Sequence, residues 1–113
     1  MKSLNYLPVL LILFAIAKAP DAMAANSKSV TVTNHTSYTM SEFYASASDN
    51  SGWDTSNNLL AGQALAPGHA TTITIADGLA ACNYDLMAVL YGSAEHAYRY
   101  QVNACGSGTW TVH

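Results

Sequence analysis

Hydrophobic and polar residues alternate along most of the chain, and a period of two is typical of β-strands with one buried face. Valines alternate with threonines in residues 29–34, and isoleucines alternate with threonines in residues 72–75. Near the end, Trp110 and Val112 fall on the same side of a last short segment. Apart from the N-terminal segment, no stretch has the spacing of a capped amphipathic helix, although residues 59–61 are compatible with a single turn. The pattern predicts an all-β domain.

The segment 38–48 is expected to form a second strand whose side chains divide between two faces. One face carries Phe43, Ala45 and Ala47, and the other carries Met40, Glu42 and Tyr44. Turns are expected at Pro67-Gly68 and Asp77-Gly78, because proline presets φ and glycine supplies a positive φ. About six or seven strands in one short chain predict a small antiparallel β-sandwich.

Two further alternating runs, residues 84–90 and 96–102, are separated by Gly92-Ser93 and are expected to fold back as a hairpin. A symmetric pairing of the two runs has its midpoint inside the turn. A slip of one residue would gather a larger apolar set on one face, namely Leu86, Ala88, Tyr98 and Tyr100. The slipped register makes the better core, and the sequence leaves both registers open.

The only two cysteines of the chain, Cys82 and Cys105, stand at the open end of this hairpin. The symmetric pairing places them opposite each other, and a bulge in the turn would set them one residue apart. Directly opposed residues of a non-hydrogen-bonded pair lie about 4.5 Å apart at Cα, within reach of a disulfide. A redox-active or metal-binding pair would need CxxC spacing or neighbouring histidine ligands, and neither is present. We therefore predict a structural disulfide, which stabilises by about 3 kcal/mol for a loop of roughly 24 residues.

The first residues have the pattern of an export signal. Lys2 gives a positive start, and the apolar run at residues 4–17 is too short to span a bilayer. Residues 22–24, Ala-Met-Ala, match the small-x-small pattern that signal peptidase cuts. We expect residues 1–24 to be a removed signal peptide and residues 25–113 to form one β-sandwich domain, periplasmic or secreted. An oxidising compartment agrees with the predicted disulfide.

The charge of the expected mature chain excludes several partners. Without the leader, two basic residues, Lys28 and Arg99, stand against six acidic ones, a formal charge of −4. Nucleic acids are bound through clustered lysine and arginine, so we expect no nucleic-acid partner. An anionic membrane surface is disfavoured for the same reason.

The loop at residues 46–58 is the most unusual polar segment, with Asp49, Asn50 and Asp54 placed around Trp53. Calcium prefers oxygen ligands at such a density, which makes Asp49 and Asp54 calcium candidates, although the order of an EF-hand loop is missing. A second interpretation is a turn-rich surface loop whose Trp53 covers the edge of the core. A third is a binding loop that presents Trp53 to a partner.

Residues capable of catalysis are scattered along the chain. The four histidines, which show no metal-ligand spacing, are His35, His69, His96 and His113. Asp85, beside Tyr84 in the hairpin, is expected to hold a strand end or loop by a hydrogen bond. Ser107 lies in a Gly-Ser-Gly segment but lacks the strand and helix of a nucleophile elbow. We expect no enzymatic activity, no catalytic residue, no metal and no cofactor, and the enzymatic alternative is a small hydrolase using Asp85, His96 or the loop.

One pattern covers nearly all of the chain after the leader: an Asn-x-Thr strand end, a Trp/Asp loop before Leu-Leu, a Leu-x-Pro-Gly turn and Cys-x-Tyr-Asp-Leu with a closing Cys. Its residues here are Asn34, Thr36, Trp53, Leu59, Leu60, Leu65, Pro67, Gly68, Cys82, Tyr84, Asp85, Leu86 and Cys105. The chain thus resembles a group of small exported bacterial β-sandwich proteins of uncharacterised function, some of which are called argininosuccinate lyase. That enzyme resembles a long helical bundle, which a chain this short and β-rich does not. The resemblance implies the fold and the compartment and transfers no catalytic residue.

Together these observations predict an exported, non-enzymatic binding or structural module of the cell envelope or medium, of which a hydrolase inhibitor is one concrete form. The expected partner is an extracytoplasmic protein or a glycan. The alternative is a calcium-stabilised surface domain, whose melting temperature would rise with calcium and not with magnesium.

Overall fold

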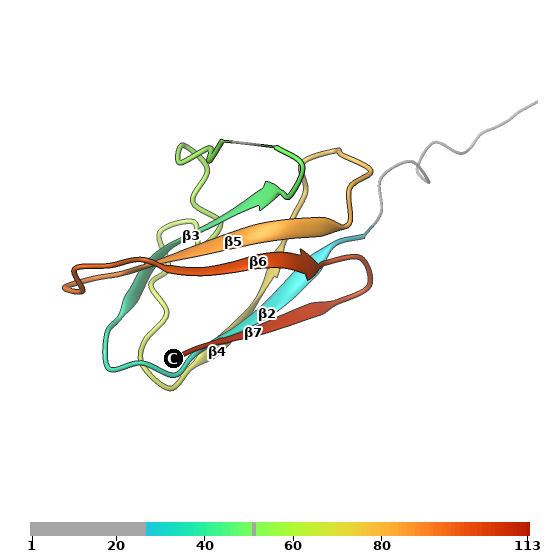
Figure 1. Cartoon of the computed structure of the whole chain (residues 1–113). Coiled ribbons are helices and arrows are strands. Elements are labelled where there is room, and N and C mark those ends of the chain that lie inside the picture. Colours follow the sequence, from blue (N-terminus) through green and yellow to red (C-terminus); the bar gives the residue numbers. More distant parts are fainter. Residues whose placement is uncertain (1–26, 51) are drawn as a thin grey trace, which may run out of the picture.

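The computed structural model of the chain describes residues 27–50 and 52–113 (Figure 1). The regular secondary structure of these residues consists of strands alone, and six strands form two three-stranded sheets. The predicted all-β sandwich is therefore confirmed, whereas the predicted signal peptide over residues 1–24 lies outside the described residues. In the described part of the chain, no helix has the length and apolar character needed to cross a membrane.

The first sheet has the strand order β4-β2-β7. Its strands are β4 (Ala70–Thr74), β2 (Ser29–Asn34) and β7 (Gly108–Val112). The central strand β2 is antiparallel to β4 and parallel to β7. The alternation acts as expected, because Val30 and Val32 are fully buried and their cross-strand partners Ile73 and Trp110 are also buried.

The second sheet has the order β3-β5-β6 and is antiparallel throughout. Its strands are β3 (Met40–Ala47), β5 (Asn83–Leu90) and β6 (Ala97–Asn103). The chain changes sheet at every connection except the one between β5 and β6, which is the predicted hairpin. Figure 1 shows the two sheets as stacked layers, with the hairpin turn at one end of the upper layer.

The core lies between the two sheets. The largest fully buried side chains come from the second sheet and include Tyr84, Phe43, Met40 and Leu86. Phe43 meets Trp110 of the first sheet with the ring centroids 6.0 Å apart. Both sheets thus contribute inward-facing side chains to one hydrophobic layer, as expected for a sandwich.

Met40 was predicted to lie on the face opposite Phe43, and this expectation is wrong. Met40 is fully buried in the core with Phe43. Met40 pairs with Leu90 and Glu42 pairs with Val89, so Ser41 is an extra residue in β3. Such a β-bulge shifts the alternation by one residue, and Met40 and Phe43 therefore share the core face.

Neither of the two registers considered for the hairpin is observed along its whole length. Leu86 pairs with Arg99 and Met87 pairs with Tyr98, two residues away from the symmetric pairing. Leu86 lies in the core as expected, but Tyr98 and Tyr100 are 45% and 61% exposed. The slipped register would place these two tyrosines on the core face, and this is not observed. Tyr98 pairs with Met87, residues paired between neighbouring strands share a face, and Met87 points away from the core cluster.

Candidate functional site

An aromatic strip, which we define as His96, Tyr98, Tyr100 and Trp53, lies on the outer face of the second sheet. His96 directly precedes β6, and Tyr98 and Tyr100 lie within it. These are alternate residues, and alternate residues of a strand share a face. The ring centroid of Tyr98 lies 6.4 Å from His96 and 6.0 Å from Tyr100, and the planes of the two tyrosines differ by 2°. The Trp53 ring lies 6.1 Å from that of Tyr98. The rings of His96, Tyr100 and Trp53 each contact the ring of Tyr98, so the four rings form one continuous group with Tyr98 at its centre.

A β-bulge in β6 lies at one end of this row. Tyr84 pairs with Val102, so Tyr100 and Gln101 together lie opposite the single residue Asp85. Gln101 has a φ of 56°, in the left-handed region that L-residues rarely adopt. Its N–H donates to Oδ1 of Asp85 at 3.0 Å. The carboxylate of Asp85 thus stabilises the bulge that lets Tyr100 face outward while Val102 faces the core.

A buried row of side chains lies beside the aromatic strip on the outer face. Tyr98 is paired with Met87 of β5, and Met87 is paired with Tyr44 of β3. Met87 and Tyr44 are each only 5% exposed, although both point away from the core cluster. Trp53 follows β3 along the chain and its ring contacts Tyr98 on β6, so the segment that carries it reaches from one edge strand of this sheet to the other.

The loop that carries Trp53 is attached to β3 by a side-chain contact. The hydroxyl of Ser46 donates to the carbonyl oxygen of Gly52 at 2.9 Å. Trp53 is half-buried and contacts Tyr98, outside the core cluster. The interpretation in which Trp53 covers the edge of the core is therefore wrong, and Trp53 belongs to the outer face.

One end of the aromatic strip borders a hollow of about 450 Å³ at the end of the sandwich. His96 lines both the strip and the hollow. The other polar or aromatic residues that line the hollow are Thr36, Ser37, Tyr38, Ser93, Glu95 and His113. Hydroxyl, carboxylate and imidazole groups therefore continue from the end of the aromatic row.

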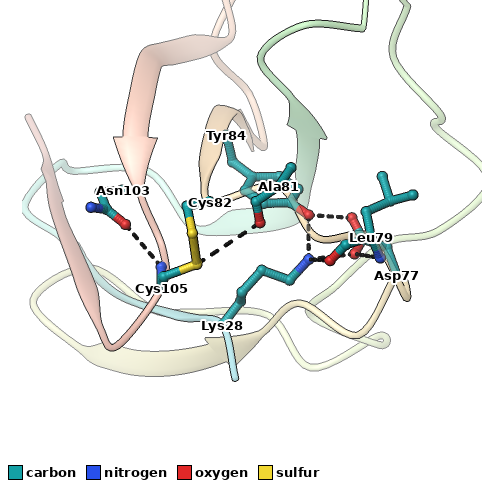
Figure 2. The surroundings of a disulfide bond; sticks show 8 residues. All are labelled: Lys28, Asp77, Leu79, Ala81, Cys82, Tyr84, Asn103 and Cys105. Carbon is teal, nitrogen blue, oxygen red and sulfur yellow. Dashed lines mark hydrogen bonds and ion pairs between the residues drawn. A yellow bond between two sulfur atoms is a disulfide. The ribbon is translucent and has the colours of Figure 1, made fainter. Parts of the chain in front are cut away.

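At the opposite end of the hairpin lies a buried cluster that we call the lysine clasp, made of Lys28, Asp77, Tyr84 and the carbonyl of Leu79 (Figure 2). Nζ of Lys28 donates to Oδ1 of Asp77 at 2.6 Å, to the hydroxyl of Tyr84 at 2.6 Å and to the carbonyl of Leu79 at 2.8 Å. The Tyr84 hydroxyl in turn donates to Oδ2 of Asp77. The three donor positions of the ammonium are thereby satisfied in the protein interior.

The charges of the lysine clasp support each other. Burial alone lowers the pKa of Lys28, but its hydrogen bonds to Asp77 and Tyr84 outweigh burial and raise that pKa above 10.5. Burial alone raises the pKa of Asp77, but hydrogen bonds from Lys28, Tyr84 and the Leu79 N–H lower it below 3.8. The side chain of Lys28 is 1% exposed and that of Asp77 is 32% exposed. The clasp is therefore a partly buried ion pair, charged at neutral pH.

The predicted disulfide between Cys82 and Cys105 is confirmed, with the two Cα atoms 5.1 Å apart. Cys105 also forms an isolated antiparallel bridge with Lys28. The N–H of Ala104 donates to the carbonyl oxygen of Cys82 at 2.8 Å. Figure 2 shows the disulfide and the lysine clasp side by side at the mouth of the hairpin. The covalent link and the ion pair therefore hold the same end of the sandwich.

The acidic residues proposed for calcium are used in part by the loop itself. Asp54 accepts hydrogen bonds from the backbone N–H and the hydroxyl of Ser56, and these bonds lower its pKa. Asp49 and Asn50 lie at the turn after β3, and the N–H of Asn50 donates to the carbonyl of Ala47. Within residues 27–50 and 52–113, no group of three or more His, Cys, Asp or Glu side chains is placed to hold a metal ion.

The residues considered for hydrolysis lie apart on the hairpin. His96 comes directly before β6, whereas Asp85 lies opposite Gln101 near the far end of that strand. Asp85 also accepts a hydrogen bond from Ser48 at 2.8 Å, which is the structural role expected for it. Ser107 is an exposed residue directly before β7.

Comparison with protein-family models, with curated proteins and with solved structures found no match for this chain. The resemblance to the exported bacterial group is therefore supported only by the residues that carry it. The candidate site has to be argued from its own geometry.

Two features of the site were missed by sequence reasoning. In the sequence Lys28 enters only the net charge, and no local pattern pairs it with Asp77, 49 residues away. Only the slipped register of the hairpin would place Tyr98 and Tyr100 in the core. The two tyrosines lie on the outer face because Leu86 pairs with Arg99, and this register follows only once the bulge at Gln101 is known.

Proposed function

We propose that this protein is an exported, non-enzymatic binding module, periplasmic or secreted, that binds its partner through the aromatic strip. The observation behind the proposal is the row of four rings around Tyr98, two of them tyrosines that are about half exposed. Aromatic side chains contribute most of the binding free energy in many interfaces. A contiguous row of them on a sheet therefore supports recognition.

The scaffold supports the same function because it holds the rings in place before a ligand arrives. Tyr98 lies on a strand that is hydrogen-bonded to β5, and its neighbour across the strand is buried. The left-handed backbone at Gln101 is a local strain of the kind that clusters at binding sites. Preorganised side chains lose little conformational entropy on binding.

Export is supported by the cysteines and the leader pattern. The disulfide between Cys82 and Cys105 is typical of oxidising compartments, and the first 24 residues match a signal peptide. A non-enzymatic role is supported by the separation of Asp85 from His96, because Asp85 on β5 lies opposite Gln101, whereas His96 lies directly before β6. Catalytic groups have to be within hydrogen-bond reach of one reacting atom.

The test measures retention of the full chain, purified in its disulfide-bonded form, on isolated cell envelopes and on immobilised polymers of the culture medium. The double variant Tyr98→Ala/Tyr100→Ala is expected to lose at least nine-tenths of the retained protein, roughly the tenfold effect of two aromatic contacts. The matched control is Tyr91→Ala, because Tyr91 is 77% exposed, the most of any tyrosine in the described part of the chain, and lies outside the strip. Equal retention of the wild type and both variants would contradict the proposal.

A further inference from the structure

We infer that the ligand of the aromatic strip is a neutral glycan chain that lies along β6, with its sugar rings packed on the aromatic rings. The inference rests on the proposed function and names the ligand class of that same site. Three observations carry it: the chemistry of the strip, the scarcity of positive charge around it, and its area.

The strip offers both contacts that a sugar requires. A pyranose ring has a flat face of C–H groups and a rim of hydroxyls, so it needs an apolar platform beside hydrogen-bonding groups. Tyr98, Tyr100 and Trp53 each combine an aromatic face with one polar atom, and His96 adds an imidazole. The near-parallel planes of Tyr98 and Tyr100 repeat this platform along the strand, as successive rings of a chain do.

Charge argues for a neutral ligand. The two basic residues that follow the leader are Lys28 and Arg99. Lys28 is buried in the lysine clasp. Arg99 is exposed, but it is paired with the core residue Leu86, so its position belongs to the face of β6 opposite Tyr98 and Tyr100. Anionic ligands are recognised by accessible cations or by bidentate arginine, and the aromatic strip holds neither. An acidic polysaccharide would therefore meet a negatively charged protein in which Arg99, on the opposite face of β6, is the one exposed lysine or arginine of the described residues.

The area of the strip argues for a thin ligand instead of a folded protein. An aromatic side chain buries about 150–250 Å² when fully covered, so three exposed rings and the partly buried Trp53 supply at most roughly 400 Å². A standard protein interface needs about 800 Å² per partner. Among the described residues, Leu79 is the only exposed large aliphatic side chain, and it lies at the lysine clasp. The other exposed large hydrophobic side chains of the described residues are Tyr38, which lines the hollow, and Tyr91 beside the hairpin turn. Together with the strip they still leave the apolar surface short of a standard protein interface.

The hollow beside His96 provides the polar end of this site. Its volume of about 450 Å³ suits one small ring, and Glu95 and His113 line it with an acceptor and an imidazole. Within the described residues the only salt bridge joins Lys28 to Asp77, so the Glu95 carboxylate is not neutralised by a cation. A terminal sugar placed there would exchange hydroxyl hydrogen bonds with these groups while the chain continues over Tyr98.

The strip also sets the length of ligand that binds best. From His96 to Tyr100 the strand rises by four residues, roughly 13 Å. Affinity is therefore expected to increase with each added sugar until the chain covers this length, and then to remain constant. Tyr100→Ala shortens the platform and should move the plateau to a shorter chain.

The experiment titrates the full disulfide-bonded chain with neutral homo-oligosaccharides of increasing length, both β-linked and α-linked, by calorimetry and by tryptophan fluorescence. Trp53 is the reporter because it lies in the strip, whereas Trp110 is only 6% exposed in the core. Tyr98→Ala should weaken binding at least tenfold, and Tyr91→Ala should leave it unchanged. Circular dichroism of each variant shows that the fold is kept.

The outcomes separate the ligand class from the proposed function. Neutral chains that bind with a length plateau and depend on Tyr98 support the inference. Binding of uronic-acid chains alone, or neutral binding that Tyr98→Ala leaves unchanged, overturns it. Strip-dependent retention on envelopes that protease treatment abolishes also overturns it, because the ligand is then a protein, and the proposed function stands. If the chain binds no oligosaccharide and its retention on envelopes does not depend on the strip, both the ligand class and the proposed function are contradicted.

Discussion

The two ends of the β5–β6 hairpin are built from different kinds of contact. At the mouth of the hairpin, opposite its turn, a disulfide and a buried ammonium hold the strands together, and each of the three donor positions of the Lys28 ammonium has a partner. Toward the turn, the row centred on Tyr98 lies on the surface, and its recorded ring contacts are with other members of the aromatic strip. The covalent and buried ionic contacts thus lie at one end of the hairpin, and the proposed binding surface lies toward the other.

The separation has a physical reason. A buried charge stabilises only when its partners are fixed, so the lysine clasp needs the rigid mouth of the sandwich. Exposed rings contribute little to folding and remain available to a ligand. Changes at the mouth of the hairpin should therefore lower stability and spare binding, and changes in the strip should lower binding and spare stability. Four stability measurements test this division.

The largest effect is expected from the double variant Cys82→Ala/Cys105→Ala. Without the covalent link the unfolded chain regains loop entropy, and the free energy of unfolding should fall by about 3 kcal/mol. Urea denaturation followed by circular dichroism measures the change. Reduction of the wild type with dithiothreitol is the matched control and should give the same midpoint. A loss below about 1 kcal/mol would show that the neighbouring strands hold this end without the disulfide.

The second effect is expected from Lys28→Met, which keeps the length of the side chain and removes the charge. Breaking a buried ion pair costs about 3–5 kcal/mol, but Asp77 is 32% exposed and keeps its hydrogen bond from Tyr84. We therefore expect a loss of about 2 kcal/mol in the free energy of unfolding at pH 7. Oligosaccharide affinity should not change, because Lys28 lies at the other end of the hairpin. A weaker affinity would break the division between the two ends.

The pH dependence of Lys28→Met gives a further check on the same contact. The pKa of Asp77 is lowered on folding, so its contribution is present above pH 3.8 and is lost as the pH falls through the folded value. The pKa of Lys28 is raised, so its contribution is present below pH 10.5 and is lost at higher pH. Between these limits the wild type should exceed Lys28→Met by a constant amount. The difference should shrink in acid, and a constant difference at pH 2–3 would contradict the ion pair.

Most of the fold could be predicted from the sequence because its alternation is regular where strands are regular. Residues 29–34 and 72–75 follow a period of two. The first run is β2, and the second lies in β4 except for its last residue, which directly follows that strand. The cysteine pair was predictable because its spacing brackets a hairpin in a chain with an export pattern. These inferences need only local periodicity and the chemistry of one residue type.

The errors have one physical cause, which is that bulges shift the period without a clear sequence signal. Ser41 moves Met40 into the core, and Gln101 turns Tyr98 and Tyr100 out of it. Neither residue is a glycine, which would have indicated a bulge. The lysine clasp was also beyond local reasoning, because Lys28 and Asp77 are 49 residues apart and meet only in the tertiary structure.

The smallest effect is expected at the bulge, which lies between the two ends of the hairpin. Gln101 has a φ of 56°, which costs an L-residue about 1 kcal/mol or more and costs glycine almost nothing. Because glycine also raises the entropy of the unfolded chain, Gln101→Gly should increase the free energy of unfolding by only about 0.5 kcal/mol. The matched control Gln63→Gly should decrease it, since Gln63 is not among the residues with positive φ. Oligosaccharide affinity should stay equal to that of the wild type, because the bulge that directs Tyr100 outward is kept; a weaker affinity would place the Gln101 side chain in the binding site.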